Sequence, residues 1–231
     1  MQILSHRGFH LGATGIHENT LSAFERAIRC GADGIETDIR LTADAQAVLF
    51  HDRLAPDDRL VQSLTRPELA AVVGYDVPTV TEALSEFPDT FWNLEVKCTA
   101  AVPAVLEAVK RHPRQDLLLL TSFRHDVISD CAGLDVACGL IAAHAPIDVP
   151  QMLGVWQKHA NVRTIVWDFN VLDANLIQQA RSCGFQVFTY GMVTLSEHQS
   201  CREWGVNGVI TDFPDRARNS RGDFSPPVPT S

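Results

Sequence analysis

Short apolar runs alternate with amphipathic stretches along almost the whole chain, and this alternation constrains the fold more than any other feature. The apolar runs have the length of buried strands, and the amphipathic stretches have the apolar spacing of helices that cover a sheet. Consecutive parallel strands need a crossover, usually a helix, so the repeat predicts a parallel sheet. The expected strands are residues 2–6, 34–39, 91–97, 117–121, 136–141, 163–167, 186–190 and 208–211.

Eight strand–helix units in 231 residues predict a single domain with the α/β fold of a TIM (β/α)8 barrel. We expect the barrel to occupy residues 1–215, with a short insertion at 52–77 after the second strand. An extra strand near 46–51 should pair with the second strand. Residues 216–231 contain few apolar anchors, so we expect a flexible tail and little room for a full eighth helix.

Cap residues mark several of the expected helices. The first helix should begin after Thr20 and end at Gly31. Two capping boxes start later helices, Thr79 with Glu82 and Thr194 with Glu197. The helix that begins at Thr194 should run to 204. The remaining expected helices are a short one near 67–73 in the insertion, one with Pro103 in its first turn, and three near 123–132, 149–160 and 173–183.

Polar side chains stand at the ends of three expected strands. Side chains two residues apart on a strand point to the same face, so Glu36 faces the same way as Asp38, and Glu95 the same way as Lys97. If these strands are parallel neighbours, the carboxylates of Glu36, Asp38 and Glu95 converge, and a divalent cation would offset the cost of burying them. Oxygen ligands favour Mg²⁺ or Ca²⁺ over zinc.

Two histidines at strand ends, His6 and His51, remain available for proton transfer near neutral pH. Taken singly, each of these polar residues also fits a solvent-exposed or structural role, because charged side chains are mostly exposed. Their convergence at strand ends favours an active site instead. The pattern predicts a metal-assisted site for a phosphate ester.

The composition excludes several classes of partner. A net charge of −9 argues against a basic nucleic-acid-binding surface. The N-terminal segment has no export pattern, and no apolar stretch is long enough to span a membrane, so we expect no stable membrane insertion. Six scattered cysteines without disulfide or metal spacing favour reduced thiols in a cytoplasmic protein. The oligomeric state stays open.

Six segments, in order along the chain, together resemble the glycerophosphodiester phosphodiesterase family. They are Ser5-His6-Arg7-Gly8, Glu18-Asn19-Thr20, Glu36-Thr37-Asp38, His51-Asp52, Glu95-Val96-Lys97 and Gly208-Val209-Ile210-Thr211-Asp212-Phe213-Pro214. Each segment is a weak signal alone, and the combination is specific. The resemblance implies a TIM barrel whose site lies at the C-terminal ends of the strands.

The resemblance also implies an activity and roles for seven residues. The reaction is the metal-dependent hydrolysis of glycerophosphodiesters, such as glycerophosphocholine or glycerophosphoethanolamine, to glycerol 3-phosphate and an alcohol. The attacking group is water or a neighbouring glycerol hydroxyl. The implied metal ligands are Glu36, Asp38 and Glu95. The implied acid–base pair is His6 and His51, and the implied phosphate contacts are Arg7 and Lys97.

The chain departs from the family pattern around the substrate. His17 stands where the family usually has proline, and the insertion is shorter than in many members and lacks their Arg-Thr-rich stretch. Residues 187–192, in and just after the seventh strand, differ from the family's Trp-Thr-Val-Asn sequence. We expect Tyr190 to supply the aromatic wall there and Trp167, at the end of the sixth strand, to line the pocket.

Three further polar residues receive supporting roles. We expect Asp52 to orient His51, Asn19 to cap the first helix or touch the phosphate, and Asp212 to cap the final turn. Two other functions stay open at this point. One is a phospholipase that acts on lysophospholipids or related lipids, and the other is a catalytically silent ligand-binding barrel.

Overall fold

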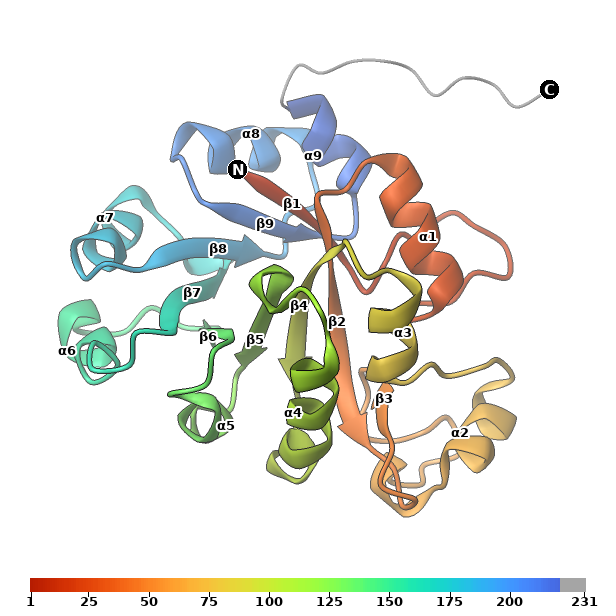
Figure 1. Cartoon of the computed structure of the whole chain (residues 1–231). Coiled ribbons are helices and arrows are strands. Elements are labelled where there is room, and N and C mark those ends of the chain that lie inside the picture. The colour runs from red at the N-terminus through yellow and green to blue at the C-terminus, as the bar shows by residue number, and fades with distance from the viewer. Residues whose placement is uncertain (221–231) are drawn as a thin grey trace.

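Eight parallel strands close into a barrel in the computed structural model, which describes residues 1–220 (Figure 1). Around the barrel the strands follow the order β1-β9-β8-β7-β6-β5-β4-β2, and β2 pairs with β1 to close it. The predicted (β/α)8 barrel is therefore confirmed. The strands are β1 (Gln2–His6), β2 (Gly34–Leu41), β4 (Phe91–Val96), β5 (Leu118–Ser122), β6 (Ala137–Ala142), β7 (Val162–Asp168), β8 (Gln186–Tyr190) and β9 (Gly208–Thr211).

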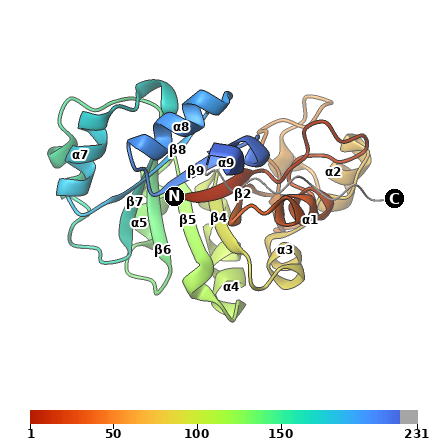
Figure 2. The same ribbon diagram turned by 90° about the horizontal axis from the view of Figure 1, so that it is seen from above.

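One helix follows each barrel strand on the outside of the barrel, as the two views show (Figures 1 and 2). These helices are α1 (Leu21–Cys30), α3 (Val80–Glu86), α4 (Val102–Arg111), α5 (His125–Cys131), α6 (Val149–Gly154), α7 (Ala174–Ser182), α8 (Leu195–Glu203) and α9 (Pro214–Ser220). Short 3-10 turns also occur, η1 (Val61–Ser63), η2 (Thr99–Ala101), η3 (Gln115–Leu117) and η4 (Phe169–Val171). Within residues 1–220 no helix is both long enough and apolar enough to cross a bilayer.

Two expectations about helices need correction. The helix expected at 149–160 ends at Gly154, because glycine disfavours the helical state and residues 155–158 form turns instead. Residues 216–220, which were expected in a flexible tail, instead complete α9, and α9 serves as the eighth helix. Its Ala217 packs in the main core. The rest of the expected tail, 221–231, lies outside the described residues.

The insertion after β2 has a small core of its own. β3 (Ala47–Leu49) runs antiparallel to β2 and confirms the expected extra pairing, and α2 (Arg66–Val73) begins with a capping box at Thr65. Val48, Leu64 and Leu69 are buried among other apolar residues of this segment. The insertion also touches the loop between β1 and α1, where the rings of His17 and Tyr75 stack with centroids 4.2 Å apart.

Alternation along the strands sorts side chains between the barrel interior and the helix layer. Leu4, Val166, Phe188 and Ile210 pack together inside the barrel. The interior is crowded, because a Cβ atom at Gly208 would lie only 2.1 Å from the Phe188 ring. Side chains two residues beyond these interior positions therefore project from the C-terminal mouth of the barrel, where the polar strand ends meet.

Candidate active site

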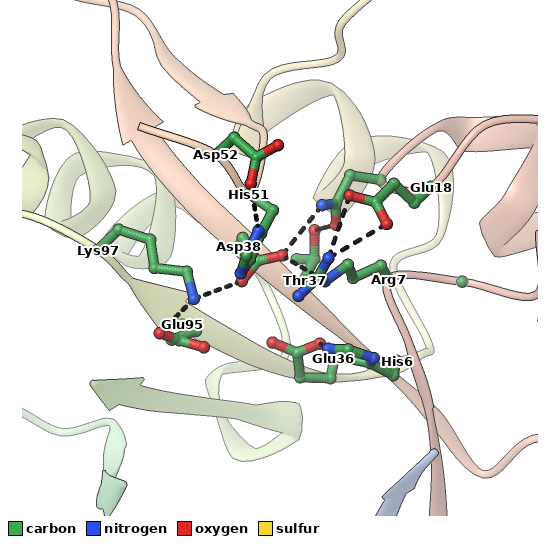
Figure 3. Close-up of polar contacts among 12 residues, drawn as sticks. His6, Arg7, Glu18, Glu36, Thr37, Asp38, His51, Asp52, Glu95 and Lys97 are labelled. Atoms are coloured by element: carbon green, nitrogen blue, oxygen red, sulfur yellow. Dashed lines mark hydrogen bonds and ion pairs between the residues drawn. The ribbon is translucent and has the colours of Figure 1, made fainter. Parts of the chain in front are cut away.

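Three carboxylates meet at the mouth of the barrel (Figure 3). Glu36 and Asp38 lie on β2 and Glu95 lies on β4, and the parallel register sets Asp38 beside Glu95. Oxygens of the three side chains all lie within 4.8 Å of one another. The residues are almost completely buried, with exposed fractions of 3%, 1% and 6% respectively. The convergence predicted from strand periodicity is confirmed.

Burial and mutual repulsion make this cluster unfavourable without a cation. Burial first, and then the charge of Asp38, raises the pKa of Glu36 to about 8. Burial also raises the pKa of Glu95. Burial would do the same to Asp38, but the charges of Lys97 and Arg7 outweigh it and hold the pKa of Asp38 below its ordinary value.

Two basic side chains partly neutralise the carboxylates. Lys97 Nζ lies 2.8 Å from Asp38 and 2.6 Å from Glu95. Arg7 Nε lies 3.0 Å from the other oxygen of Asp38, while its Nη1 donates to both oxygens of Glu18 at 3.2 Å. Lys97 and Arg7 thus approach Asp38 from opposite sides and fix its orientation (Figure 3).

Asn19 supports Asp38 from the loop that precedes α1. Its amide donates to Asp38 at 3.1 Å, and its carbonyl accepts the Thr37 hydroxyl at 2.7 Å. Both Arg7 and Asn19 have positive φ, at 55° and 56°, and the Asn19 N–H donates to the Arg7 carbonyl. Such unfavourable backbone conformations persist where surrounding contacts hold them, and they are frequent at functional sites. The capping residue of α1 is Thr20, not Asn19.

The cluster fits a divalent metal ion. Glu36 Oε2 is buried and has no hydrogen-bond partner within residues 1–220, and His6 Nε2 lies 3.8 Å away, beyond hydrogen-bond distance. With all three carboxylates ionised, as a bound cation would favour, these carboxylates and the side chains of Lys97 and Arg7 carry one net negative charge in sum. A hard divalent cation would occupy that position with oxygen ligands only, which matches the preference of Mg²⁺ or Ca²⁺.

Each of the two histidines has a carboxylate behind it. His6 Nδ1 lies 2.7 Å from Asp212, and His51 Nδ1 lies 2.8 Å from Asp52. A carboxylate only accepts hydrogen bonds, so Nδ1 carries the proton in both rings and Nε2 is left for chemistry. Burial lowers the pKa of His6, but the hydrogen bond that His6 donates to Asp212 and the charge of Glu36 outweigh it and raise that pKa overall. The expected contact between Asp52 and His51 is confirmed.

Asp212 has a different role from the one that the sequence predicts. It was expected to cap the final turn, but its carboxylate binds His6, and the Thr211 hydroxyl accepts the Phe213 N–H instead. The sequence did contain a signal. The segment from Gly205 to Asp212 repeats the pattern from Gly31 to Asp38, which places Asp212 at the inward position that Asp38 occupies on β2.

Of the two aromatic residues that were expected to line the pocket, only Tyr190 lies at the mouth of the barrel. Trp167 is fully buried in the layer between sheet and helices, because its neighbour Val166 points into the barrel, so Trp167 does not line the pocket. Tyr190 occupies an inward-facing position of its strand and therefore lies at the mouth. Its ring packs edge-to-face against Phe123, with ring centroids 6.1 Å apart. Burial, followed by the charges of Asp168 and Glu95, raises the pKa of Tyr190 to about 12.

Comparisons with known proteins agree with this arrangement. Residues 6–216 match the family model of the glycerophosphoryl diester phosphodiesterase family. A probable glycerophosphodiester phosphodiesterase of Mycobacterium tuberculosis is 32% identical over 96% of this chain and 92% of its own length. A human protein named lysophospholipase D is 24% identical over 96% of this chain and 86% of its own length.

Solved structures share the fold. A phosphodiesterase of Oleispira antarctica, solved in complex with the product sn-glycerol-3-phosphate, matches with a TM-score of 0.82 at 22% identity. The match covers 96% of this chain and 97% of that chain. The range matched by the family model contains every carboxylate, histidine and basic side chain of the site described above.

Proposed function

The chain belongs to the glycerophosphoryl diester phosphodiesterase family and is a phosphoric diester hydrolase, and on that premise we propose that it hydrolyses glycerophosphodiesters to glycerol 3-phosphate and an alcohol with the help of a divalent metal ion. Glycerophosphocholine and glycerophosphoethanolamine are the proposed substrates. The observation that carries the proposal is the meeting of Glu36, Asp38 and Glu95 with two carboxylate-backed histidines at one barrel mouth.

Glu36, Asp38 and Glu95 would hold the metal ion, which we propose is Mg²⁺ or Ca²⁺. When bound, such an ion supplies positive charge that stabilises the charge developing on the phosphate oxygens. It would also give the cluster one net positive charge, which complements the single negative charge of a phosphodiester.

Arg7 and Lys97 are proposed to contact the phosphate. Both side chains are mostly buried yet reach the mouth, and each has more N–H donors than its present partners use. Their pKa values are raised, because nearby carboxylates outweigh the effect of burial, so both stay charged at neutral pH. Preorganised donors of this kind favour a transition state in which charge collects on the non-bridging oxygens.

His6 and His51 are proposed to move the protons. One Nε2 removes a proton from the attacking hydroxyl, of water or of the glycerol moiety, as the new bond to phosphorus forms. The other histidine, protonated on both ring nitrogens, gives its Nε2 proton to the alkoxide as the ester bond breaks. If the glycerol hydroxyl attacks, water then opens the resulting cyclic phosphate to glycerol phosphate, with the two histidines in exchanged roles. Asp212 and Asp52 hold each ring in the tautomer that leaves Nε2 available. Tyr190 and Phe123 would form the aromatic side of the mouth.

A cytoplasmic location is part of the proposal. All six cysteines are unpaired, and Cys131, Cys138 and Cys201 are buried. Unpaired, buried thiols are typical of proteins in reducing compartments.

The first test is hydrolysis of glycerophosphocholine and glycerophosphoethanolamine with and without a chelator. We expect release of glycerol phosphate that stops when the metal is removed and returns with added Mg²⁺ or Ca²⁺. Full activity in chelator would refute the metal role. His51→Ala should lose at least a hundredfold in kcat, whereas His144→Ala, which removes an exposed histidine, should behave as wild type.

A specific observation favours lysophospholipids as a second substrate class. Phe123 and Val193 are about half exposed in the loops after β5 and β8, on the face that carries the site. An exposed apolar rim suits an acyl chain. Lysophosphatidylcholine assayed beside glycerophosphocholine separates the two classes, and a preference for the soluble diester would exclude the lipid as main substrate.

A further inference from the structure

A second group of basic side chains lines a small pocket next to the carboxylates. The pocket has a volume of about 130 Å³. Its polar lining comes from Arg40 at the end of β2, Arg53 and Gln62 of the insertion, and Cys98 after β4, and its other walls are apolar, from Leu41, Leu60 and Val61. A water molecule takes roughly 30 Å³ in the liquid. The pocket therefore has room for a carboxylate or a phosphate group.

The strand register places this pocket beside the active site. Asp38 pairs with Glu95 and Ile39 with Val96, so Arg40 comes next to Lys97 and follows Asp38 on the same strand face. Arg40 Nε also donates to the backbone carbonyl of His51 at 2.7 Å. Arg40 thus touches the segment that carries one of the proposed acid–base residues.

Neither Arg40 nor Arg53 has a carboxylate partner within residues 1–220. The His51 carbonyl accepts the side-chain hydrogen bond of half-buried Arg40, and exposed Arg53 makes no side-chain hydrogen bond in this part of the chain. The nearby carboxylates are engaged elsewhere, Asp38 and Glu95 with Lys97 and Asp52 with His51. By contrast, Arg59 of the same insertion pairs with Asp57 at 2.7 Å.

Two guanidinium groups at one small pocket, without carboxylates of their own, attract an anion. The anion is best supplied by the substrate, because the pocket lies within one strand position of Lys97, which is proposed to contact the phosphate. We propose that Arg40 and Arg53 form an anion subsite that selects phosphodiesters whose alcohol carries a second negative group. This inference rests on the proposed function.

Glycerophosphoserine and glycerophosphoethanolamine form a matched pair for the test, because they differ by one carboxylate. The quantity to measure is the ratio of their kcat/KM values, serine diester over ethanolamine diester, with saturating metal. Wild type should prefer the serine diester. Arg40→Gln and Arg53→Gln should each lower the ratio about tenfold, the size expected for one charge-assisted hydrogen bond. Arg40→Gln should also slow the hydrolysis of both diesters, so only the ratio of their kcat/KM values tests the anion subsite.

Arg59→Gln is the control, since it removes a positive charge from the same insertion but outside the pocket, and its ratio should equal that of wild type. Unchanged ratios in both pocket variants would overturn the proposal. So would a wild-type enzyme without preference for the serine diester, as expected if the pocket held only a free anion such as inorganic phosphate. Turnover of either diester upholds the proposed function whatever the ratio. If neither diester is hydrolysed, calorimetric dissociation constants for the two diesters give the same comparison.

Discussion

At the scale of single residues, the contact between His6 and Asp212 joins the first barrel strand to the last. The two residues are 206 positions apart in the chain, yet their side chains lie 2.7 Å apart. The carboxylate fixes the tautomer of the ring and supports its positive form. A residue that reaches the reaction only through another acts as a positioning residue, and its loss changes how the other residue titrates.

Asp212→Asn tests this role. We expect kcat to fall about 10- to 100-fold. Because the Asp212 carboxylate raises the pKa of His6, its removal should move the limb of the pH–rate profile that reports His6 to lower pH. Asp215→Asn removes an exposed carboxylate three residues away and should change neither quantity. A slower enzyme with an unshifted profile would argue against control of His6 by Asp212.

At the scale of secondary-structure elements, α8 is anchored to the barrel by a buried histidine. His198 Nδ1 donates to the Thr194 carbonyl at 2.6 Å, and Nε2 lies 2.9 Å from the Thr211 hydroxyl on β9. A neutral imidazole can make both hydrogen bonds, with Nδ1 as the donor and Nε2 as the acceptor. Burial lowers the pKa of His198 below its ordinary value of about 6.5, because the charged form loses its hydration.

The expected consequence is acid sensitivity of the fold. The unfolded chain takes up a proton at His198 as pH falls below about 6.5, whereas the folded chain resists it, so this stability contribution is present above that pH and is lost below it. His198→Gln should cost about 1–2 kcal/mol in urea unfolding at pH 8. The gap to wild type should narrow by pH 5.5, and a gap independent of pH would contradict the assignment. His144→Gln is the exposed control.

At the scale of the whole molecule, the carboxylate cluster would link binding of the proposed metal ion to stability. With the metal absent, Glu36 holds its proton up to about pH 8 in the folded chain, while the unfolded carboxyl loses it near pH 4.5. The metal-free protein is therefore expected to lose stability as pH rises from 4.5 to 8. A bound ion removes this penalty, because it favours the ionised form.

Glu36→Gln isolates this linkage in thermal unfolding. In chelator, the variant should show a flatter dependence of Tm on pH than wild type. Saturating Mg²⁺ or Ca²⁺ should stabilise wild type by about 2.7 kcal/mol at a hundred times Kd and should stabilise the variant much less. Glu107→Gln changes an exposed glutamate on α4 and should keep the full metal effect. An equal metal effect in Glu36→Gln would exclude this carboxylate as a ligand.

The sequence by itself determined the repeat of strands and helices, the capped helix starts and the convergence of Glu36, Asp38 and Glu95, because these follow from local periodicity and from the parallel order of strands. Local periodicity shows which side chains share a face, but it does not show which face points inward. Closure and register of the barrel decided that, and they turned Trp167 outward while leaving Tyr190 at the mouth. Only the tertiary structure brought Asp212 to His6 and placed Arg40 and Arg53 at one pocket, because both arrangements depend on where distant segments pack.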